Sequence, residues 1–361
     1  MSERYQGGYI TASVINPNGQ MDAVATGVWS LMEQFYFHKS ELWPNRSSKA
    51  IFGGGAHAPA VAKYHEDVSA VSNYYDIMDF VTMITTGNAI DFGNLVVGKF
   101  GTGCVGSDTR ACFAGGYIGT PAGDITNVIE YVAIDTTGNA TDFGDTSVTR
   151  NYMTGGVASS TRGCYCAGEE PSGGTSGRDV IDYITIASTG NATDFGNLGS
   201  GTTDGMGAAC STTRGMWAGG HDNAGGGAGP NNTISYITIA STGNTTDFGD
   251  LSATHGSGIS GCSSNLRGIF MHDDLMEYVT IASTGNVTDF GDPSVNRYLS
   301  GGASNNTRGI FGGGWSASLE QSTNILDYVT IASTGNAADF GDLTQGRVYA
   351  SATGNNHGGL Q

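Results

Sequence analysis

Histidine, carboxylate and aromatic residues gather in a few segments that differ in sequence from one part of the chain to the next. Imidazole and carboxylate groups bind metal ions and exchange protons near neutral pH, and aromatic rings stack on sugars. These segments therefore form the candidate binding surface. The candidate residues are His57, Tyr64, His65, Glu66, Asp67, Tyr117, Glu169, Glu170, His221, Asp222, His272, Asp273, Asp274 and Trp315.

The same residues have a simpler interpretation as solvated polar groups of surface loops. A His–Asp or His–Glu–Asp cluster could bind a metal ion or act as an acid–base pair, but the sequence does not show which residues converge. No nucleophile–base arrangement is evident. We therefore predict no catalytic residue, no metal ion and no cofactor.

The six cysteines lie in expected strands of different repeat units, not in paired loops. Cys112 and Cys164 stand where other units have Ile or Met, which is typical of small core residues. The Cys164-x-Cys166 spacing lacks the second ligand pair of a zinc site. We predict reduced, structural thiols.

Two interleaved repeats supply the elements that must position these residues. Thr-Gly-Asn-x-x-Asp-Phe-Gly occurs six times, with spacings of 51, 52, 53, 42 and 50 residues between its copies. A cation followed by a short apolar segment recurs six times on the same period. Six units of about 50 residues predict a repeat architecture. The repeated cations are Lys49, Arg110, Arg162, Arg214, Arg267 and Arg308 in this segment, and Lys99, Arg150, Arg297 and Arg347 just after the Asp-Phe-Gly step.

One unit contains four short strand-like segments. In the last full unit we expect a first strand beginning at residues 297–300, a turn at 301–306, and strands at 309–312, 325–331 and 337–343, with a hairpin turn at 333–336. Four antiparallel strands per unit are typical of a propeller blade. Apolar residues on both faces of residues 181–186 agree with a sheet packed between neighbours, and the Phe of each Asp-Phe-Gly step is the expected wedge between blades.

The two ends of the repeat region complement each other. The first unit begins at Ser48 with its second strand, while residues 346–351 resemble a first strand with nothing after them. We predict an all-β, six-bladed β-propeller over residues 48–361, closed by the C-terminal strand, with a trimeric β fibre as the alternative fold. The variable second-to-third loops should share one face of the ring.

Composition limits the partners. Net charge is −18 and glycine accounts for 59 of 361 residues. An acidic surface argues against nucleic acid, and no apolar run has membrane-spanning length. The N-terminus lacks the pattern of a signal peptide.

The acid of each Asp-Phe-Gly step has two interpretations. We expect it to form a repeated, partly buried ion pair with the repeated cations, not a calcium site, because the spaced carboxylates of a calcium loop are missing. These acids are Asp91, Asp142, Asp194, Asp247, Asp289 and Asp339.

Residues 1–47 do not repeat. A strand-like segment at 8–15 precedes a short expected helix that starts near Ser30 with a capping box. The aromatic-rich part either caps the propeller or docks into another protein. The candidate docking residues are Trp29, Leu31, Phe35, Phe37 and Trp43.

Two resemblances follow from these motifs. Residues 308–313 and 324–328 resemble the kelch repeat, which implies a propeller and often protein binding, although this chain has Phe where kelch has Trp in the last strand. The amino-acid sequences of residues 183–196 and 27–35 are similar to segments of structural proteins from marine tailed bacteriophages, particularly cyanophages.

These resemblances imply a non-enzymatic component of a phage particle, a capsid decoration or a tail appendage. It would be made in the host cytoplasm without a signal peptide and exposed on the particle surface. The expected partners are other virion proteins through the N-terminal arm, host surface glycan or protein, and further copies of the chain. The alternatives are a glycan-binding attachment module that uses exposed Trp315, Tyr117 and Tyr64, and a glycan-degrading enzyme, which needs two carboxylates across a cleft.

Overall fold

The computed structural model describes residues 48–58, 72–118, 124–153, 155–170, 179–199, 203–222, 229–256, 258–355 and 357. The chain divides into two compact units, Met1–Ser48 and Lys49–Gln361. Residues 1–47, with the expected strand, helix and docking segment, lie outside the described residues. In the part described there is no helix that is long and apolar enough to cross a membrane.

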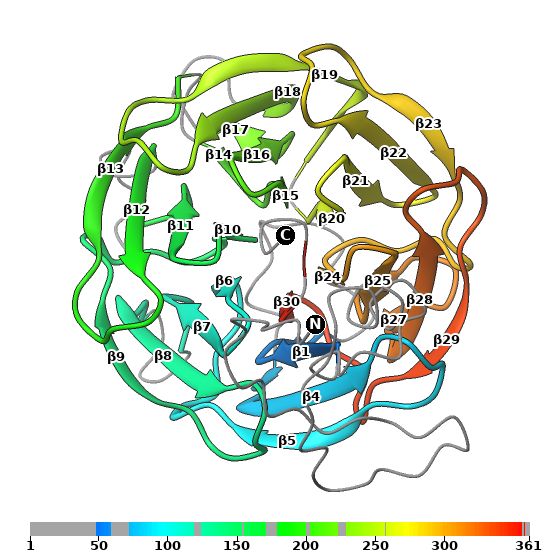
Figure 1. The fold of residues 1–361 in the computed structure, drawn as a ribbon. Coiled ribbons are helices and arrows are strands. Elements are labelled where there is room, and N and C mark those ends of the chain that lie inside the picture. The colour runs from blue at the N-terminus through cyan, green and yellow to red at the C-terminus, as the bar shows by residue number, and fades with distance from the viewer. Residues whose placement is uncertain are drawn as a thin grey trace, which may run out of the picture. The chain divides into compact units, whose positions relative to one another are not determined.

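The second unit is a six-bladed β-propeller of four-stranded antiparallel sheets around one axis (Figure 1). From the axis outward, blades 1 to 3 are β30 (Ser351–Gly354), β1 (Lys49–Gly53), β4 (Ile77–Thr82), β5 (Ile90–Asn94); β6 (Gly103–Gly106), β7 (Arg110–Ala114), β8 (Val128–Ala133), β9 (Thr141–Asp145); and β10 (Val157–Ala158), β11 (Arg162–Cys166), β12 (Val180–Thr185), β13 (Thr193–Asn197). Blades 4 to 6 are β15 (Gly207–Cys210), β16 (Arg214–Ala218), β18 (Gly229–Thr238), β19 (Thr246–His255); β20 (Ser260–Ser263), β21 (Arg267–His272), β22 (Leu275–Thr280), β23 (Thr288–Gly291); and β24 (Gly301–Ser304), β25 (Arg308–Gly312), β28 (Ile325–Thr330), β29 (Ala338–Asp342).

Short two-stranded ribbons extend three blades at their second-to-third connections. They are β2 (Ala56–His57) with β3 (Ser72–Tyr74), β14 (Thr203–Asp204) with β17 (His221–Asp222), and β26 (Trp315–Ser316) with β27 (Gln321–Ser322). The ribbon β14–β17 continues into the sheet of blade 4 through β18.

The C-terminal strand closes the ring, as predicted. Strand β30 pairs antiparallel with β1 over four residues, from Ala50 opposite Gly354 to Gly53 opposite Ser351. Because β1 is otherwise the innermost strand of its sheet, this pairing covers an exposed edge. The first blade is therefore built from both ends of the repeat region.

The innermost strands lie a few residues later than the sequence suggested. In blade 6 the expected turn at 301–306 contains β24, whereas Leu299, assigned to the strand, has a φ of 61°. Six strands converge at the axis, so only small residues fit there: a Cβ on Gly302 would lie 2.2 Å from the carbonyl oxygen of Gly261. The glycine-rich segment predicted as a turn is therefore a strand, whose residues are small because the axis leaves no room for larger side chains.

Six apolar cores lie between the six pairs of neighbouring blades. The core between blades 1 and 2 combines Phe92 from the outer strand of blade 1 with Phe113 and Val132 of blade 2. The other five cores are built in the same way. The predicted wedge role of the repeated Phe is confirmed, because each of Phe92, Phe143, Phe195, Phe248, Phe290 and Phe340 belongs to such a core.

The Thr-Gly-Asn turns join each blade to the preceding one at the rim. The amide of Gly138 donates to the carbonyl oxygen of Phe92 at 2.7 Å, and the amide of Asn94 donates to Oδ1 of Asn139 at 3.0 Å. We call this contact the rim clasp. Its glycine bond recurs from Gly87 to Phe340, Gly190 to Phe143, Gly243 to Phe195, Gly285 to Phe248 and Gly335 to Phe290. The clasp therefore runs around the whole ring and crosses the closure between blades 6 and 1.

Candidate functional site

The second-to-third loops and the fourth-to-first connections share one face of the ring, as expected. Isolated backbone bridges join the two kinds of connection in several blades, for example Phe100 with Tyr117 and Tyr298 with Trp315. We call this surface the loop face. Much of the variable sequence at its loop tips, including Tyr64, His65, Glu66 and Asp67, lies outside the described residues.

An aromatic cluster lies on the loop face beside the central axis. Its buried members include Phe100, Tyr152 and Tyr349, with Tyr117 partly buried against them. The rings of Phe100 and Tyr117 are 5.3 Å apart. The exposure expected for Trp315 is wrong, because the side chain is only 2% exposed and belongs to this cluster. Its indole lacks the free face that a stacked sugar requires.

Two histidines from neighbouring blades, His255 on β19 of blade 4 and His272 on β21 of blade 5, meet at the edge of this cluster. The rings of His255 and His272 are 4.5 Å apart, and the ring of His272 stacks on that of Tyr298 at 6.2 Å. Burial and the neighbouring His255 lower the pKa of His272 to about 4, although Asp274 acts in the opposite direction. The pair is therefore neutral near neutral pH, and Asp273 forms the adjacent tight turn with a φ of 55°.

The remaining loop-face candidates lie on the connections of blades 1, 3 and 4. His57 is half-buried on β2, while His221 and Asp222 are half-buried on β17. Glu169 forms a backbone bridge with Asn151, and Glu170 follows it. The described residues contain no group of three or more His, Cys, Asp or Glu side chains that could hold a metal ion. The docking candidates Trp29, Leu31, Phe35, Phe37 and Trp43 fall in the part of the chain that is not described.

The predicted ion pairs form with a different acid. Arg150 Nη2 lies 2.7 Å from Asp182 Oδ2, with both side chains fully buried. The acid belongs to the third strand, not to the Asp-Phe-Gly step, whose Asp142 side chain is exposed. The other buried pairs are Lys99 with Glu130, Arg297 with Asp327 and Arg347 with Asp79. The outer strand points its Phe inward, so the preceding Asp must point outward.

The arginines that precede the short apolar segment of each unit have other partners. Arg162 lies over the ring of Tyr183 at 4.2 Å and donates to the carbonyl oxygen of Ile239 in the next blade at 2.9 Å. Arg110, Arg214, Arg267 and Arg308 make equivalent pairs of contacts. These cations thus join blades through backbone carbonyls and a tyrosine face.

Small residues of the innermost strands line the central channel. One cavity of about 40 Å³ is bordered by all six innermost strands, from Gly106 on β6 to Gly354 on β30. A second, of about 50 Å³, is bordered by Met206, Leu299 and Tyr349 among others. Spaces of this size admit a few water-sized molecules.

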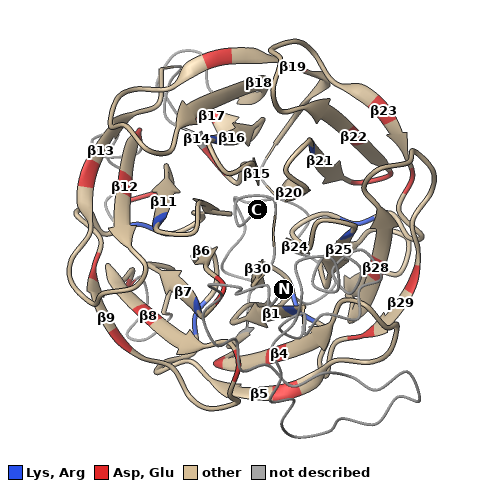
Figure 2. Cartoon of the chain, viewed as in Figure 1, with Lys and Arg blue, Asp and Glu red and all other residues tan. Residues whose placement is uncertain are grey.

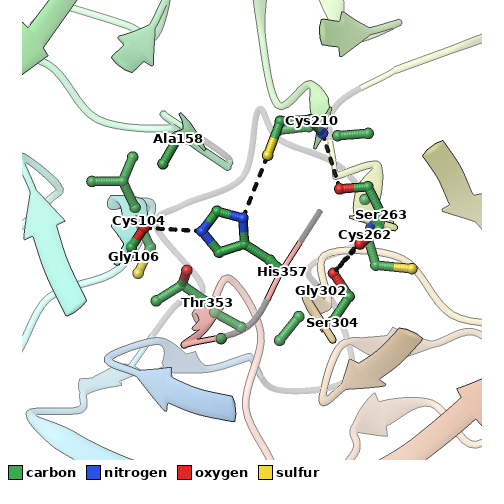
Figure 3. Close-up of a pocket in the computed structure, with 18 residues that line it drawn as sticks. Cys104, Gly106, Ala158, Cys210, Cys262, Ser263, Gly302, Ser304, Thr353 and His357 are labelled. Atoms are coloured by element: carbon green, nitrogen blue, oxygen red, sulfur yellow. Dashed lines mark hydrogen bonds between the residues drawn. The ribbon is translucent and has the colours of Figure 1, made fainter. Parts of the chain in front are cut away.

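A thiol and an imidazole meet inside the first cavity (Figure 3). Nδ1 of His357 lies 3.6 Å from Sγ of Cys210, and its Nε2 lies 2.9 Å from the carbonyl oxygen of Gly106. Both side chains are buried. A buried nucleophile beside a base is the arrangement that sequence analysis did not find.

No local pattern in the sequence points to this pair. Cys210 and His357 are 147 residues apart, and His357 lies after the last strand of the repeat. The position of Cys210 at the end of an innermost strand, with the chain continuing past β30 toward the axis, is the only feature that could have suggested it.

No family model matches the sequence, and no curated protein sequence matches it. The class of the protein rests on its fold, a closed six-bladed β-propeller.

Proposed function

We propose that the protein is a non-enzymatic structural component of a tailed-bacteriophage particle, a capsid decoration or tail appendage that presents an acidic propeller. The likeness of its repeat to segments of marine phage virion proteins supports the phage origin, and its likeness to kelch repeats supports protein binding. The observation that carries the structural role is the rim clasp, which joins every blade to its neighbour. A fully clasped ring suits a part that must hold its shape on a particle.

The outer strands give this ring an acidic rim. Each Asp-Phe-Gly acid is exposed there, and Figure 2 shows acidic positions repeating around the outermost strands. The basic residues of the repeat are instead turned inward against tyrosines or buried acids. With a net charge of −18, such a surface favours partners that carry positive charge.

Composition of purified particles tests this proposal. The chain should be recovered by quantitative mass spectrometry at a fixed ratio to the major capsid protein after gradient purification and a salt wash. A variant that lacks residues 1–47 should fold yet be lost from particles, because we assign docking to that arm. Absence of the full chain from washed particles would refute the proposal.

Glycan attachment is a second candidate, favoured by the half-buried tyrosines of the loop face. Tyr74, Tyr117 and Tyr298 pack on the aromatic cluster while keeping part of their surface exposed. If they stack on sugar rings, Tyr117→Ala should lose binding on an array of host surface glycans. Ile90→Ala, on the outer strand, is the matched control and should bind normally. An array without any bound glycan for the parent protein would exclude this candidate.

A further inference from the structure

Cys210 differs from the other five cysteines in its electrostatic surroundings. All six are buried free thiols. Burial raises the pKa of Cys112 and Cys164 to about 12, and it also raises the pKa values of Cys104, Cys166 and Cys262. Burial acts on Cys210 in the same direction, but the charge and hydrogen bond of His357, with bonds from Ala158 and Ser263, outweigh it and lower its pKa. Of the six thiols, Cys210 is therefore the one whose surroundings favour the thiolate form.

The position of His357 fixes the roles of its two ring nitrogens. A carbonyl oxygen can only accept, so Nε2 donates its hydrogen to Gly106 at 2.9 Å. In the neutral ring Nδ1 is then unprotonated and faces Sγ of Cys210 at 3.6 Å. Proton transfer from sulfur to Nδ1 produces a thiolate beside an imidazolium. The backbone carbonyl thus selects the tautomer that serves as a base.

The cavity at this pair selects what can reach it. The described residues that line it are small and mostly Gly, Ala, Ser or Thr, and none is a carboxylate, lysine or arginine. Among the described lining residues, His357 is the titratable group that faces Cys210. Cys104 and Cys262 also border the cavity, but their side chains belong to the cores between blades, and Cys164 interacts electrostatically with Cys210 from outside the cavity. A space of about 40 Å³ with no fixed counter-charge suits a small uncharged molecule.

We infer that Cys210 and His357 form a reactive-thiol site in the central channel, at which small uncharged hydroperoxides oxidise Cys210 to the sulfenic acid. The thiolate sulfur attacks one peroxide oxygen, an S–O bond forms and the O–O bond breaks. The leaving hydroxide of hydrogen peroxide, or the alkoxide of an organic hydroperoxide, takes the proton from the imidazolium and departs as water or as the alcohol. Sulfur loses two electrons to the peroxide, and His357 returns to its neutral form.

Site-resolved labelling of the folded, full-length protein tests this inference. Iodoacetamide is small and uncharged, and it replaces iodide with the thiolate sulfur, so the labelling rate of each cysteine can be followed by peptide mass spectrometry. Cys210 should react at least about ten-fold faster than any of the other five, which serve as internal controls. Hydrogen peroxide should add one oxygen to the same residue first.

A second variant separates activation from access. His357→Asn should move the pH midpoint of Cys210 labelling upward and slow the reaction at neutral pH, because the base is lost. If the side chain only blocked the channel, its replacement would speed labelling and leave the midpoint in place. Either that result, or labelling of Cys210 no faster than of Cys104 and Cys262, would overturn the inference.

Discussion

The buried charges of the propeller are held by residues that follow one blade and residues of the third strand of the next. Asp182 accepts from Arg150 at 2.7 Å and from the hydroxyl of Ser147 at 2.6 Å. Its carboxylate thus ties the end of blade 2 to the middle of blade 3. Removing two charges from water is costly, so such a pair stabilises the fold only while both partners stay in place.

Asp182→Asn should therefore be strongly destabilising. It keeps the size of the side chain but removes the carboxylate charge that contacts the fully buried guanidinium of Arg150. We expect a loss of about 3–5 kcal/mol in the free energy of unfolding, measured by denaturant titration. Asp194→Asn, at an exposed rim position, should change it by less than about 0.5 kcal/mol. Equal effects of the two changes would contradict the assignment of the buried acid.

The histidine pair between blades 4 and 5 should make the stability of the fold depend on pH. His272 has a pKa of about 4 in the folded protein against 6.5 for the free side chain, because of burial and the proximity of His255. Between these values the unfolded chain binds more protons, so stability should fall as pH decreases from 6.5 to about 4. Burial also lowers the pKa of His255, whereas the nearby carboxylates of Glu277, Asp273 and Asp274 raise it.

His272→Gln should reduce that loss of stability. Thermal unfolding of parent and variant across pH 4 to 7 gives the measurement, with the difference between them expected to narrow or reverse toward pH 4. Parallel curves over the whole range would show that His272 does not titrate as described.

At the scale of the elements, the rim clasp explains one of the two glycines that recur in every copy of the repeat. Gly93, in the Asp-Phe-Gly step, has a φ of 140°, and a Cβ there would lie 2.3 Å from the carbonyl oxygen of Gly138. A Cβ on Gly138 would have no heavy atom within 4 Å. The clasp contact therefore leaves no room for a side chain at Gly93, whereas Gly138 has room for one.

The two glycines make a matched test of the clasp. Gly93→Ala should cost roughly 2–4 kcal/mol of stability, since both the backbone conformation and the clasp are disturbed. Gly138→Ala should cost less than about 1 kcal/mol. Chemical denaturation of both variants measures the two losses of stability. A larger loss for Gly138→Ala than for Gly93→Ala would mean that the clasp is not the reason for a glycine at position 93.

How far the sequence predicts the structure differs between elements. The hairpin turns, the wedge phenylalanines and the closing strand follow from local patterns that recur six times, so repetition corrects errors in any one copy. The predicted positions of the innermost strands are wrong because the small residues of these strands are dictated by crowding at the axis. That crowding arises only in the assembled ring. The acid that pairs with Arg150 was misassigned for a related reason: Asp142 and Asp182 recur on the same period, and the period alone does not tell them apart.

The candidate site was less predictable than the fold. Trp315 looked like an exposed loop residue, yet it is buried by aromatics from other blades. Cys210 looked like the other structural thiols, since what distinguishes it is His357 from the far end of the chain. The burial of Trp315 and the pairing of Cys210 with His357 both depend on contacts between blades, which a local sequence pattern does not reveal.

At the scale of the whole molecule, the chain beyond the last complete blade has two separable roles. Strand β30 closes the sheet of blade 1, and Asn355 extends the closure through hydrogen bonds with the backbone of Lys49. His357 follows in the central cavity. Closure of the ring and activation of Cys210 are thus carried by neighbouring but different residues.

Truncations at three points should separate these roles. A chain ending at Ala350 loses β30 and exposes the edge of β1, so we expect it to lose stability comparable with the ~5–15 kcal/mol of an ordinary domain and to aggregate. A chain ending at Asn355 keeps the closure and should unfold like the parent while Cys210 loses its rapid labelling. A chain ending at His357 should match the parent in both respects. Size-exclusion chromatography, thermal unfolding and cysteine labelling supply the readouts. If the Ala350 truncation stayed monomeric with an unchanged melting temperature, β30 would be dispensable, and the six interblade cores and the rim clasp would suffice to hold the ring closed.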